Sequence, residues 1–306
     1  MSTSDNDQVE RAIAGCYATW ADYYYDNYYS AAAPYPPVHA DLVRDALIEG
    51  GVTTLLDIGC GPASFLRHIA DTDITWHGFD LTLEMVEESR KVVADMDRKG
   101  SQVWVGSVLD NQSFHAPGEP AEFDGAVMIG VLPHVPEGQD EAVLQRMCAS
   151  VTPGGVLVAE ARNALFGLFT LNRPSFDLVT NDLIDWVSLE SKATPSEALS
   201  LESVRVALAA HFRMDLPPIR GGKQGEQGYD EVLARMHVLF ELAEAARRAG
   251  WVDVELRYAH FHALPPMYEK VVPAAFLAAS LAMEDPRDWR GMVMASTVTV
   301  VGRRPS

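Results

Sequence analysis

One short segment, residues 55–66 (LLDIGCGPASFL), constrains the fold more than any other part of the chain. An apolar run typical of a strand contains Asp57 near its end, the chain then passes through Gly59 and Gly61, and apolar residues follow at helical spacing. Glycine has no side chain to clash, so the backbone can turn tightly there and approach a ligand. The segment therefore predicts a strand, a ligand-binding corner and a helix, as found where nucleotide-like cofactors bind α/β sheets.

The residues of this corner distinguish two kinds of cofactor. A dinucleotide brings an anionic pyrophosphate to the helix start, and its usual fingerprint has a third glycine. Ser64 stands at that place here. The carboxylate of Asp57 would repel a pyrophosphate, whereas it can accept hydrogen bonds from a cationic amino-acid tail, directly or through water. These residues favour S-adenosylmethionine over NAD.

A second strand pattern, residues 74–80, ends in another acid. Asp80 is placed to accept hydrogen bonds from both hydroxyls of a ribose. Thr82 is a candidate N-cap, and acidic residues in the next positions favour the first turns of a helix. The sequence thus predicts a ribose-binding acid directly before a helix.

These motifs resemble those of the class I S-adenosylmethionine-dependent methyltransferases. The family patterns D-x-G-x-G and G-x-D-x-S/T-x-x-M are similar to residues 57–61 and 78–85. Residues 103–110, 123–132 and 152–158 are similar to further family segments, although the family's commoner Gly-Asp is Gly-Ser here. The resemblance implies a doubly wound, mostly parallel seven-stranded sheet of the Rossmann-like methyltransferase fold, with S-adenosylmethionine as cofactor.

The resemblance also implies which residues hold that cofactor. Asp57, Gly59 and Gly61 are expected around the amino-acid moiety, and Asp80 at the ribose. Leu81, Ser107 and Val108 are expected around the adenine. The remaining expected contacts are Cys60 in the glycine corner and Gly130 at the fourth strand.

A tyrosine-rich cluster lies near the N-terminus, and helical spacing places Tyr17, Tyr24 and Tyr28 on one face. Together with Ala21, it resembles the aromatic-x-x-x-Ala-x-x-Tyr cap of small-molecule methyltransferases. An aromatic face can stabilise a sulfonium by roughly 0.5–2 kcal/mol per contact, and the same stripe also suits ordinary helix packing. We expect Tyr24 to contact the cofactor and Tyr28 the substrate.

The alternation of strand and helix patterns divides the chain. We expect an N-terminal helical cap at residues 1–50, an α/β core at residues 51–163 and 227–306, and a helical insertion at residues 164–226 that forms a substrate lid after strand five. Within the core we expect one long helix at residues 229–249.

Acceptor residues are expected at the ligand-binding edge of the sheet. Glu160, Arg162 and Asn163 lie at the end of strand five, and Asn163 is favoured among them for substrate binding, although a turn-forming role fits it equally. Histidines suit proton removal from an acceptor. His134 and His262 are the candidate catalytic bases and His260 a candidate substrate contact, while packing roles and catalysis by proximity alone remain open.

Composition limits the partners. A formal net charge of −19 argues against nucleic-acid substrates, which require dense Lys and Arg. Three scattered cysteines and dispersed histidines predict neither disulfides nor a metal site. The first residues lack the features of a signal peptide, and the longest apolar run is too short to span a bilayer, so we expect a cytoplasmic protein. A homodimer is an open prediction.

The sequence therefore predicts transfer of a methyl group from S-adenosylmethionine to a nitrogen or oxygen of a small metabolite, in specialised metabolism. One alternative is an S-adenosylmethionine-binding protein without methyl transfer, acting as a regulator or in another rearrangement. A less favoured alternative is an NAD-dependent oxidoreductase.

Overall fold

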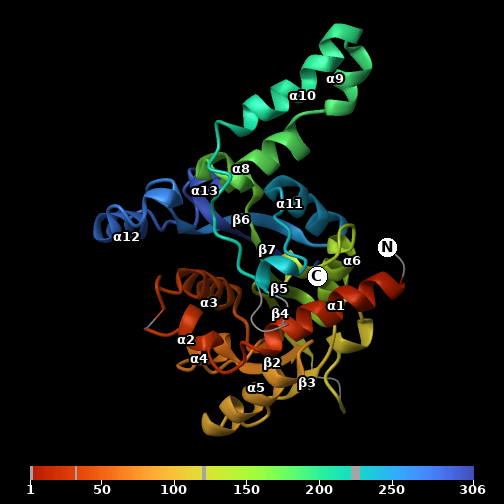
Figure 1. Ribbon diagram of the computed structural model, residues 1–306. Coiled ribbons are helices and arrows are strands. Elements are labelled where there is room, and N and C mark those ends of the chain that lie inside the picture. The colour runs from red at the N-terminus through yellow and green to blue at the C-terminus, as the bar shows by residue number, and fades with distance from the viewer. Residues whose placement is uncertain (1–2, 32, 119–121, 222–227) are drawn as a thin grey trace.

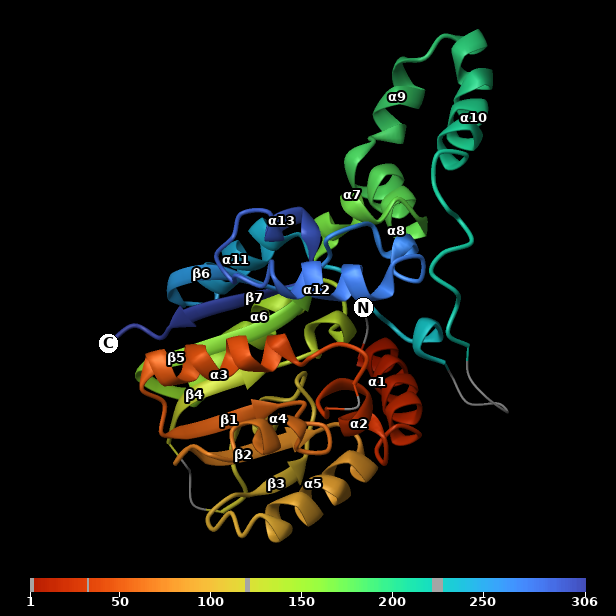
Figure 2. The same ribbon diagram turned by 90° about the vertical axis from the view of Figure 1, so that its left-hand side faces the viewer.

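The computed structural model describes residues 3–31, 33–118, 122–221 and 228–306 (Figure 1). A seven-stranded sheet with the order β3-β2-β1-β4-β5-β7-β6 runs through the protein (Figure 2). Neighbouring strands from β3 to β5 are parallel, whereas β7 is antiparallel to both β5 and β6. The doubly wound, mostly parallel sheet expected from the sequence is confirmed. The strands are β1 (Thr54–Ile58), β2 (Thr75–Asp80), β3 (Val103–Val105), β4 (Phe123–Met128), β5 (Val151–Arg162), β6 (Val252–Phe261) and β7 (Ala295–Arg303).

Helices cover both faces of this sheet. Residues of α3 (Val38–Gly50), α4 (Ser64–His68) and α5 (Leu83–Asp95) share one buried cluster with the strands, and residues of α6 (Asp140–Ser150) and α11 (Leu239–Arg248) share the other. Short 3-10 helices follow several strands or precede α11. They are η1 (Asn111–Phe114), η2 (Leu132–His134), η3 (Ala164–Phe166), η5 (Tyr229–Glu231) and η6 (Pro266–Tyr268).

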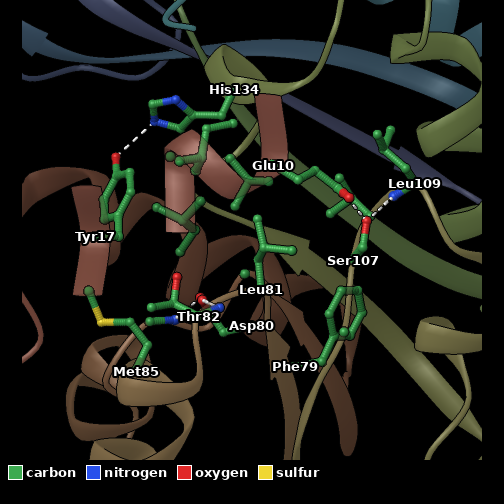
Figure 3. Close-up of a pocket in the computed structure, with 18 of the residues that line it drawn as sticks. Glu10, Tyr17, Phe79, Asp80, Leu81, Thr82, Met85, Ser107, Leu109 and His134 are labelled. Carbon is green, nitrogen blue, oxygen red and sulfur yellow. Dashed lines mark hydrogen bonds between the residues drawn. The ribbon is translucent and has the colours of Figure 1, made fainter. Parts of the chain in front are cut away.

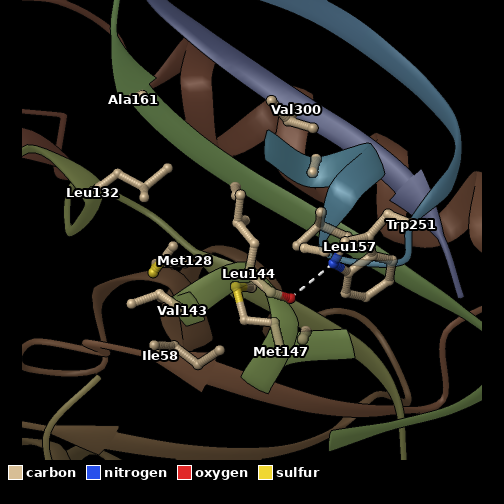
Figure 4. Packing of buried hydrophobic residues seen from close by; sticks show 14 of the residues in the cluster. Ile58, Met128, Leu132, Val143, Leu144, Met147, Leu157, Ala161, Trp251 and Val300 are labelled. Carbon is tan, nitrogen blue, oxygen red and sulfur yellow. Dashed lines mark hydrogen bonds between the residues drawn. The ribbon is translucent and has the colours of Figure 1, made fainter. Parts of the chain in front are cut away.

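The larger core cluster lies between the sheet and helices α6 and α11 (Figure 4). Side chains alternate along each strand, so Leu56 packs in this cluster while Leu55 packs in the cluster of the opposite face. The indole N–H of Trp251 donates to the carbonyl oxygen of Leu144 at 2.9 Å and ties the start of β6 to α6. Each fully buried leucine contributes about 1.5–3 kcal/mol. The strands are thus held in place by packing on both faces, and the carboxyl ends of the strands position the site.

Two N-terminal helices lie across those carboxyl ends (Figure 2). They are α1 (Thr3–Ala18) and α2 (Tyr24–Tyr28). Ile13 and Cys16 of α1 are buried in a small cluster with Val232, so α1 is packed on the core rather than free of it.

The segment after β5 is helical. It contains α7 (Gly167–Thr170), α8 (Arg173–Asp177), the π-helix η4 (Leu178–Leu183), α9 (Trp186–Lys192) and α10 (Pro195–Ala209). Helices α9 and α10 extend away from the sheet (Figures 1 and 2). The expected end of the insertion, residues 222–226, and residue 227 at the expected restart of the core lie outside the described residues.

The expected long helix at residues 229–249 is wrong in its first half, because α11 begins only at Leu239. The chain before it is extended and bonds to the end of β5. The N–H of His237 donates to the carbonyl of Arg162 at 2.8 Å, and the N–H of Ala164 donates to the carbonyl of His237 at 2.9 Å. These backbone bonds replace the helical ones. Two further helices, α12 (Pro273–Leu281) and α13 (Gly291–Met294), connect β6 to β7.

Candidate functional site

The glycine corner links the end of β1 to the end of β2. The N–H groups of Gly59 and Cys60 both donate to the carbonyl of Phe79, at 2.8 and 3.0 Å. Gly59 has a φ of 67°, and a Cβ there would overlap Cγ2 of Val131, so both the backbone and the space require glycine. At Gly61, with a φ of 53°, a Cβ would meet no atom beyond its chain neighbours within 4 Å. The backbone at Gly61 therefore borders open space.

Asp80 organises the cavity beside this corner (Figure 3). Its carboxylate accepts hydrogen bonds from the N–H of Gly61 at 2.9 Å and the N–H of Thr82 at 2.8 Å. Burial raises the pKa of Asp80, while these N–H donors favour its charged form. The carboxylate is thus fixed at the cavity wall, with lone pairs left for a ligand that carries hydroxyl groups.

Asp57 is buried at the end of β1 and lines a second, smaller cavity with Cys60 and the two glycines of the corner. Its Oδ2 accepts a hydrogen bond of 3.0 Å from the indole N–H of Trp76. Burial raises the pKa of Asp57 to about 7, although the indole bond favours the ionised form. A cation that enters this cavity would restore the charge of the carboxylate.

The far end of the Asp80 cavity is formed by Ser107, Val108 and Leu109. The hydroxyl of Ser107 donates to the carboxylate of Glu10 on α1 and accepts from the N–H of Leu109 at 2.9 Å (Figure 3). The family's carboxylate is missing from the sequence at residue 107, and the structure brings one to the same place from the N-terminal helix. No sequence signal pointed to Glu10, because it lies 97 residues away in the chain.

His134 lines the same cavity, and both of its ring nitrogens have partners in the protein. Its Nδ1 lies 2.6 Å from the carbonyl oxygen of Leu233, and its Nε2 lies 2.8 Å from the hydroxyl of Tyr17 (Figure 3). Because a carbonyl can only accept, Nδ1 carries the proton and Nε2 accepts from Tyr17. Burial lowers the pKa of His134 to about 4. The imidazole is therefore neutral and engaged on both sides.

A third cavity, of about 220 Å³, lies beyond the end of β5. Glu160 and Arg162 point into it from one face of the strand, since residues two apart share a face. Glu160 is buried, accepts a bond from the N–H of Gly130, and has an Oε2 with no partner among the described residues. Burial raises the pKa of Glu160 to about 7, although Arg162 and the Gly130 N–H favour its charged form. The expected substrate contacts Tyr28 and His260 line this cavity too.

His260 forms a pair with a histidine that the sequence did not single out. Its Nε2 lies 2.9 Å from Nδ1 of His39, which also lines the third cavity. Burial lowers the pKa of His260 to about 4, and that of His39 well below its usual range. The two rings are neutral and share one hydrogen bond.

Tyr24 joins the three cavities. Its side chain and Ile129 line all of them, and Gly130 lines both the Asp80 cavity and the third cavity. Tyr24 packs on Tyr28 with ring centroids 4.8 Å apart. The structure thus brings the expected cofactor residues into two cavities that share lining residues, and Tyr24 also lines the third. The expected residues that line the first two are Tyr24, Asp57, Gly59, Cys60, Gly61, Asp80, Leu81, Ser107, Val108 and Gly130.

Two expected residues do not line these three cavities. The amide of Asn163 donates to the carbonyls of Gly291, Met292 and Ala295, and its Oδ1 accepts from the N–H of Leu165 at 3.0 Å. Its amide therefore ties the end of β5 to the segment before β7. His262 follows β6 and lies between aromatic rings, with centroids 4.8 Å from Phe166 and 5.6 Å from Phe276.

The third cavity also contains residues that sequence reasoning missed. Trp20 stacks on Tyr229 at 5.5 Å with an interplanar angle of 13°, and the guanidinium of Arg220 lies 4.1 Å from the same tyrosine ring. Trp20 belongs to the tyrosine-rich cluster near the N-terminus, whereas Arg220 and Tyr229 lie in no such motif of the sequence. Their place depends on the path of the chain after β5.

Two features are absent from residues 3–31, 33–118, 122–221 and 228–306. In them, no three His, Cys, Asp or Glu side chains are grouped as metal ligands. No helix there has both the length and the apolar character that crossing a membrane requires.

Comparison with known proteins adds a family and a fold. Residues 56–157 match a family model described as a methyltransferase domain. A chain from the complex between the Haloferax volcanii Trm112 methyltransferase activator and the putative methyltransferase is similar, at 16% identity and a TM-score of 0.51, over 95% of this chain and 98% of that chain. No curated protein matches the sequence.

Two other similar structures are longer than this chain. An O-methyltransferase family protein from Burkholderia thailandensis is 16% identical, with a TM-score of 0.49, over 94% of this chain and 60% of that chain. Human N-acetylserotonin methyltransferase in complex with S-adenosylmethionine is 11% identical, with a TM-score of 0.48, over 95% of this chain and 56% of that chain. The match thus spans about 60% of the Burkholderia protein.

The family match begins within β1 and contains the glycine corner and Asp80, which agrees with the resemblance found in the sequence. The strand order with one antiparallel strand, β7, gives the fold of that class. S-adenosylmethionine is the cofactor of this class. Residues 56–157 are thus a methyltransferase domain by their family match, and the chain has the fold of the class I S-adenosylmethionine-dependent methyltransferases.

Proposed function

We propose that the protein transfers a methyl group from S-adenosylmethionine to a nitrogen or oxygen of a small metabolite. The supporting observation is the junction at Tyr24, where two cavities lined by the expected cofactor residues adjoin a third. A sulfonium beside Tyr24 would have its methyl group directed toward the third cavity. That cavity is smaller than the roughly 300–1,000 Å³ of sites for drug-sized ligands, so it suits a small acceptor.

For the cofactor, we assign the amino-acid moiety to the cavity of Asp57 and the ribose to Asp80. The adenine then lies between Leu81 and residues 107–109. The carboxylate of Glu10 is near enough to Ser107 to accept a hydrogen bond from the adenine amino group. Helix α1, which carries Glu10 and Tyr17, would close over the bound adenosine.

For the reaction, we assign proton removal to Glu160. A base works best with a pKa near the working pH, and the pKa of about 7 at Glu160 meets this condition. The acceptor lone pair forms the new bond to the methyl carbon while the carbon–sulfur bond breaks and its electrons remain on sulfur. The proton of the acceptor passes to Glu160. An amine that is already unprotonated needs only orientation and a dry pocket.

In this proposal the histidines do not act as the base. His134 is engaged on both ring nitrogens, so we assign it to positioning Tyr17 over the cofactor. His262 lies apart from the three cavities and has no part in the reaction. We also propose that the enzyme is cytoplasmic, acts in specialised metabolism and does not use nucleic-acid substrates. The helical insertion at residues 164–226 is proposed as the substrate lid.

The test is an acceptor screen by mass spectrometry with S-adenosylmethionine labelled in its methyl group. The proposed function requires a labelled product that gains one CH₂ on nitrogen or oxygen. Binding of S-adenosylhomocysteine without any such product would favour the regulator or another rearrangement. Tight binding of NADH in place of S-adenosylhomocysteine would favour an oxidoreductase.

A further inference from the structure

Arg162 lines the third cavity and has no ionic partner among the residues that the structure describes. Among the described residues its guanidinium has no hydrogen bond and no ion pair, and it lies 4.8 Å from the ring centroid of Tyr229. Arg220, in the same cavity, is different because its guanidinium pairs with Asp230 at 3.0 Å. Burial lowers the pKa of Arg162, although the nearby carboxylate of Asp230 favours its charged form. Within the described part of the chain, the guanidinium of Arg162 is thus left for a ligand.

The walls around this guanidinium are aromatic. Trp20 and Tyr229 form a nearly parallel stack, and Tyr24 and Tyr28 pack together at the cofactor side. Such walls favour a flat, apolar ring and exclude water around it. The aromatic side chains that line the cavity are Tyr17, Trp20, Tyr24, Tyr28, Tyr29 and Tyr229.

The charges of the cavity limit the ligand further. Arg220 is neutralised by Asp230, and the paired rings of His39 and His260 are neutral. Glu160 faces the same space and would repel a dianion when it is ionised. The balance suits a ligand with a single negative charge, and a planar guanidinium matches a carboxylate in two-point contact.

On the basis of the function proposed above, we propose that the methyl acceptor is a small aromatic carboxylic acid whose carboxylate pairs with Arg162. Its ring packs against the tyrosines of the cavity. Its hydroxyl or amino group points toward Tyr24 and Glu160, where the methyl group arrives. The acid group is bound for recognition and is not itself methylated.

The test uses binding, so that the true acceptor need not be known. The full-length protein, with tryptophans replaced by 5-fluorotryptophan and saturated with S-adenosylhomocysteine, is titrated with benzoate, phenylacetate and indole-3-acetate. Trp20→Phe assigns the fluorine resonance of Trp20, which lies in the cavity wall. The carboxylates are expected to shift this resonance, and the matched carboxamides are expected to bind about tenfold or more weakly.

Arg162→Met should weaken carboxylate binding by about tenfold to a hundredfold, and Arg162→Lys should restore part of it. Arg205→Met is the matched control, since Arg205 lies 4.5 Å over the ring of Trp186, away from the cavity, and should bind the carboxylates as the wild type does. Unchanged binding of S-adenosylhomocysteine by calorimetry shows that each variant is folded.

Three results would overturn the inference while leaving the proposed function intact. These are no Trp20 shift with any of the carboxylates, equal binding of acids and amides, or equal loss in Arg162→Met and Arg205→Met. Tighter binding of phenyl phosphate than of benzoate would also overturn it and point to a phosphate ester. Failure of wild type to bind S-adenosylhomocysteine would instead refute the proposed function.

Discussion

Oδ2 of Asp80 accepts a hydrogen bond of 2.9 Å from the backbone N–H of Gly61. The acid at the end of β2 and the glycine corner after β1 are therefore one unit, although 19 residues separate them in the chain. The same carboxylate is held by the N–H of Thr82. A ribose bound to Asp80 would thus be positioned relative to the corner that borders the amino-acid moiety.

Asp80→Ala should weaken S-adenosylhomocysteine binding by about 1.5–3 kcal/mol, the scale of hydrogen bonds to a charged group. Calorimetric titration measures this loss, and circular dichroism checks that the fold is kept. Thr72→Ala, on the surface turn before β2, is a control expected to leave affinity unchanged. Wild-type affinity in Asp80→Ala would refute the ribose assignment.

Asp57 gives cofactor binding a dependence on pH. Its pKa is raised by burial from 3.8 to about 7, so the carboxyl is largely neutral below pH 7 in the free protein. The cationic tail of S-adenosylhomocysteine prefers the ionised form, and its affinity should fall as the pH drops from 8 to 6, approaching about tenfold per pH unit. Titrations in Asp57→Asn should be weak and nearly independent of pH.

The raised pKa of Asp57 also makes the stability of the free protein depend on pH. Cofactor affinity should rise with pH, whereas the contribution of Asp57 to stability should fall. Because the folded state binds the proton more tightly than the unfolded state, Asp57 stabilises the fold at low pH and this contribution is lost as the pH rises from about 4 to about 7. Urea unfolding of wild type and Asp57→Asn across this range measures it. Parallel pH profiles for the two proteins would contradict the raised pKa.

The two glycines of the corner should respond differently to alanine. Gly59→Ala forces a left-handed backbone on alanine, at about 1–2 kcal/mol, and overlap with Val131 adds roughly 1–3 kcal/mol. Val131→Ala in the same chain should recover the second part. Gly61→Ala should cost only the backbone part, and should reduce cofactor affinity more than stability. Thermal unfolding and calorimetry separate the two effects, and equal stability losses in the two variants would contradict the geometry.

Glu160→Gln tests the assigned base. If Glu160 removes the proton, wild-type kcat with a hydroxyl acceptor should rise with pH and level off above about 7. The variant should lose roughly 10²-fold in kcat and this pH dependence, while its cofactor affinity stays the same. A variant with wild-type kcat and an unchanged profile would show that orientation alone drives transfer.

The sequence predicted the parts of the site that depend on local pattern. Asp57 and Asp80 each close a strand beside a turn, and the parallel arrangement of those strands brings them to one edge. Helical spacing was expected to place Tyr17, Tyr24 and Tyr28 on one face, but α1 ends at Ala18 and α2 begins at Tyr24, so no single helix carries them. All three nevertheless line the third cavity.

Tertiary contacts decided what the sequence missed. Glu10 and Ser107 meet only because α1 folds back across the strand ends, and no local pattern encodes that. The segment at residues 232–238 has helical character by composition, but backbone bonds to the end of β5 keep it extended. His260 and His262 are two residues apart, a spacing that puts both side chains on one face of a regular strand. β6 ends at Phe261, and His260 has a φ of 59°, so the alternation does not continue.

The central claim is that the cavities meeting at Tyr24 bind S-adenosylmethionine and deliver its methyl group to the cavity of Arg162 and Glu160. A crystal structure with S-adenosylhomocysteine tests it most directly. We predict ribose hydroxyls on Asp80, the ammonium in the cavity of Asp57, and the sulfur beside Tyr24 facing the third cavity. A ligand bound elsewhere, or with its sulfur turned away from that cavity, would contradict the account.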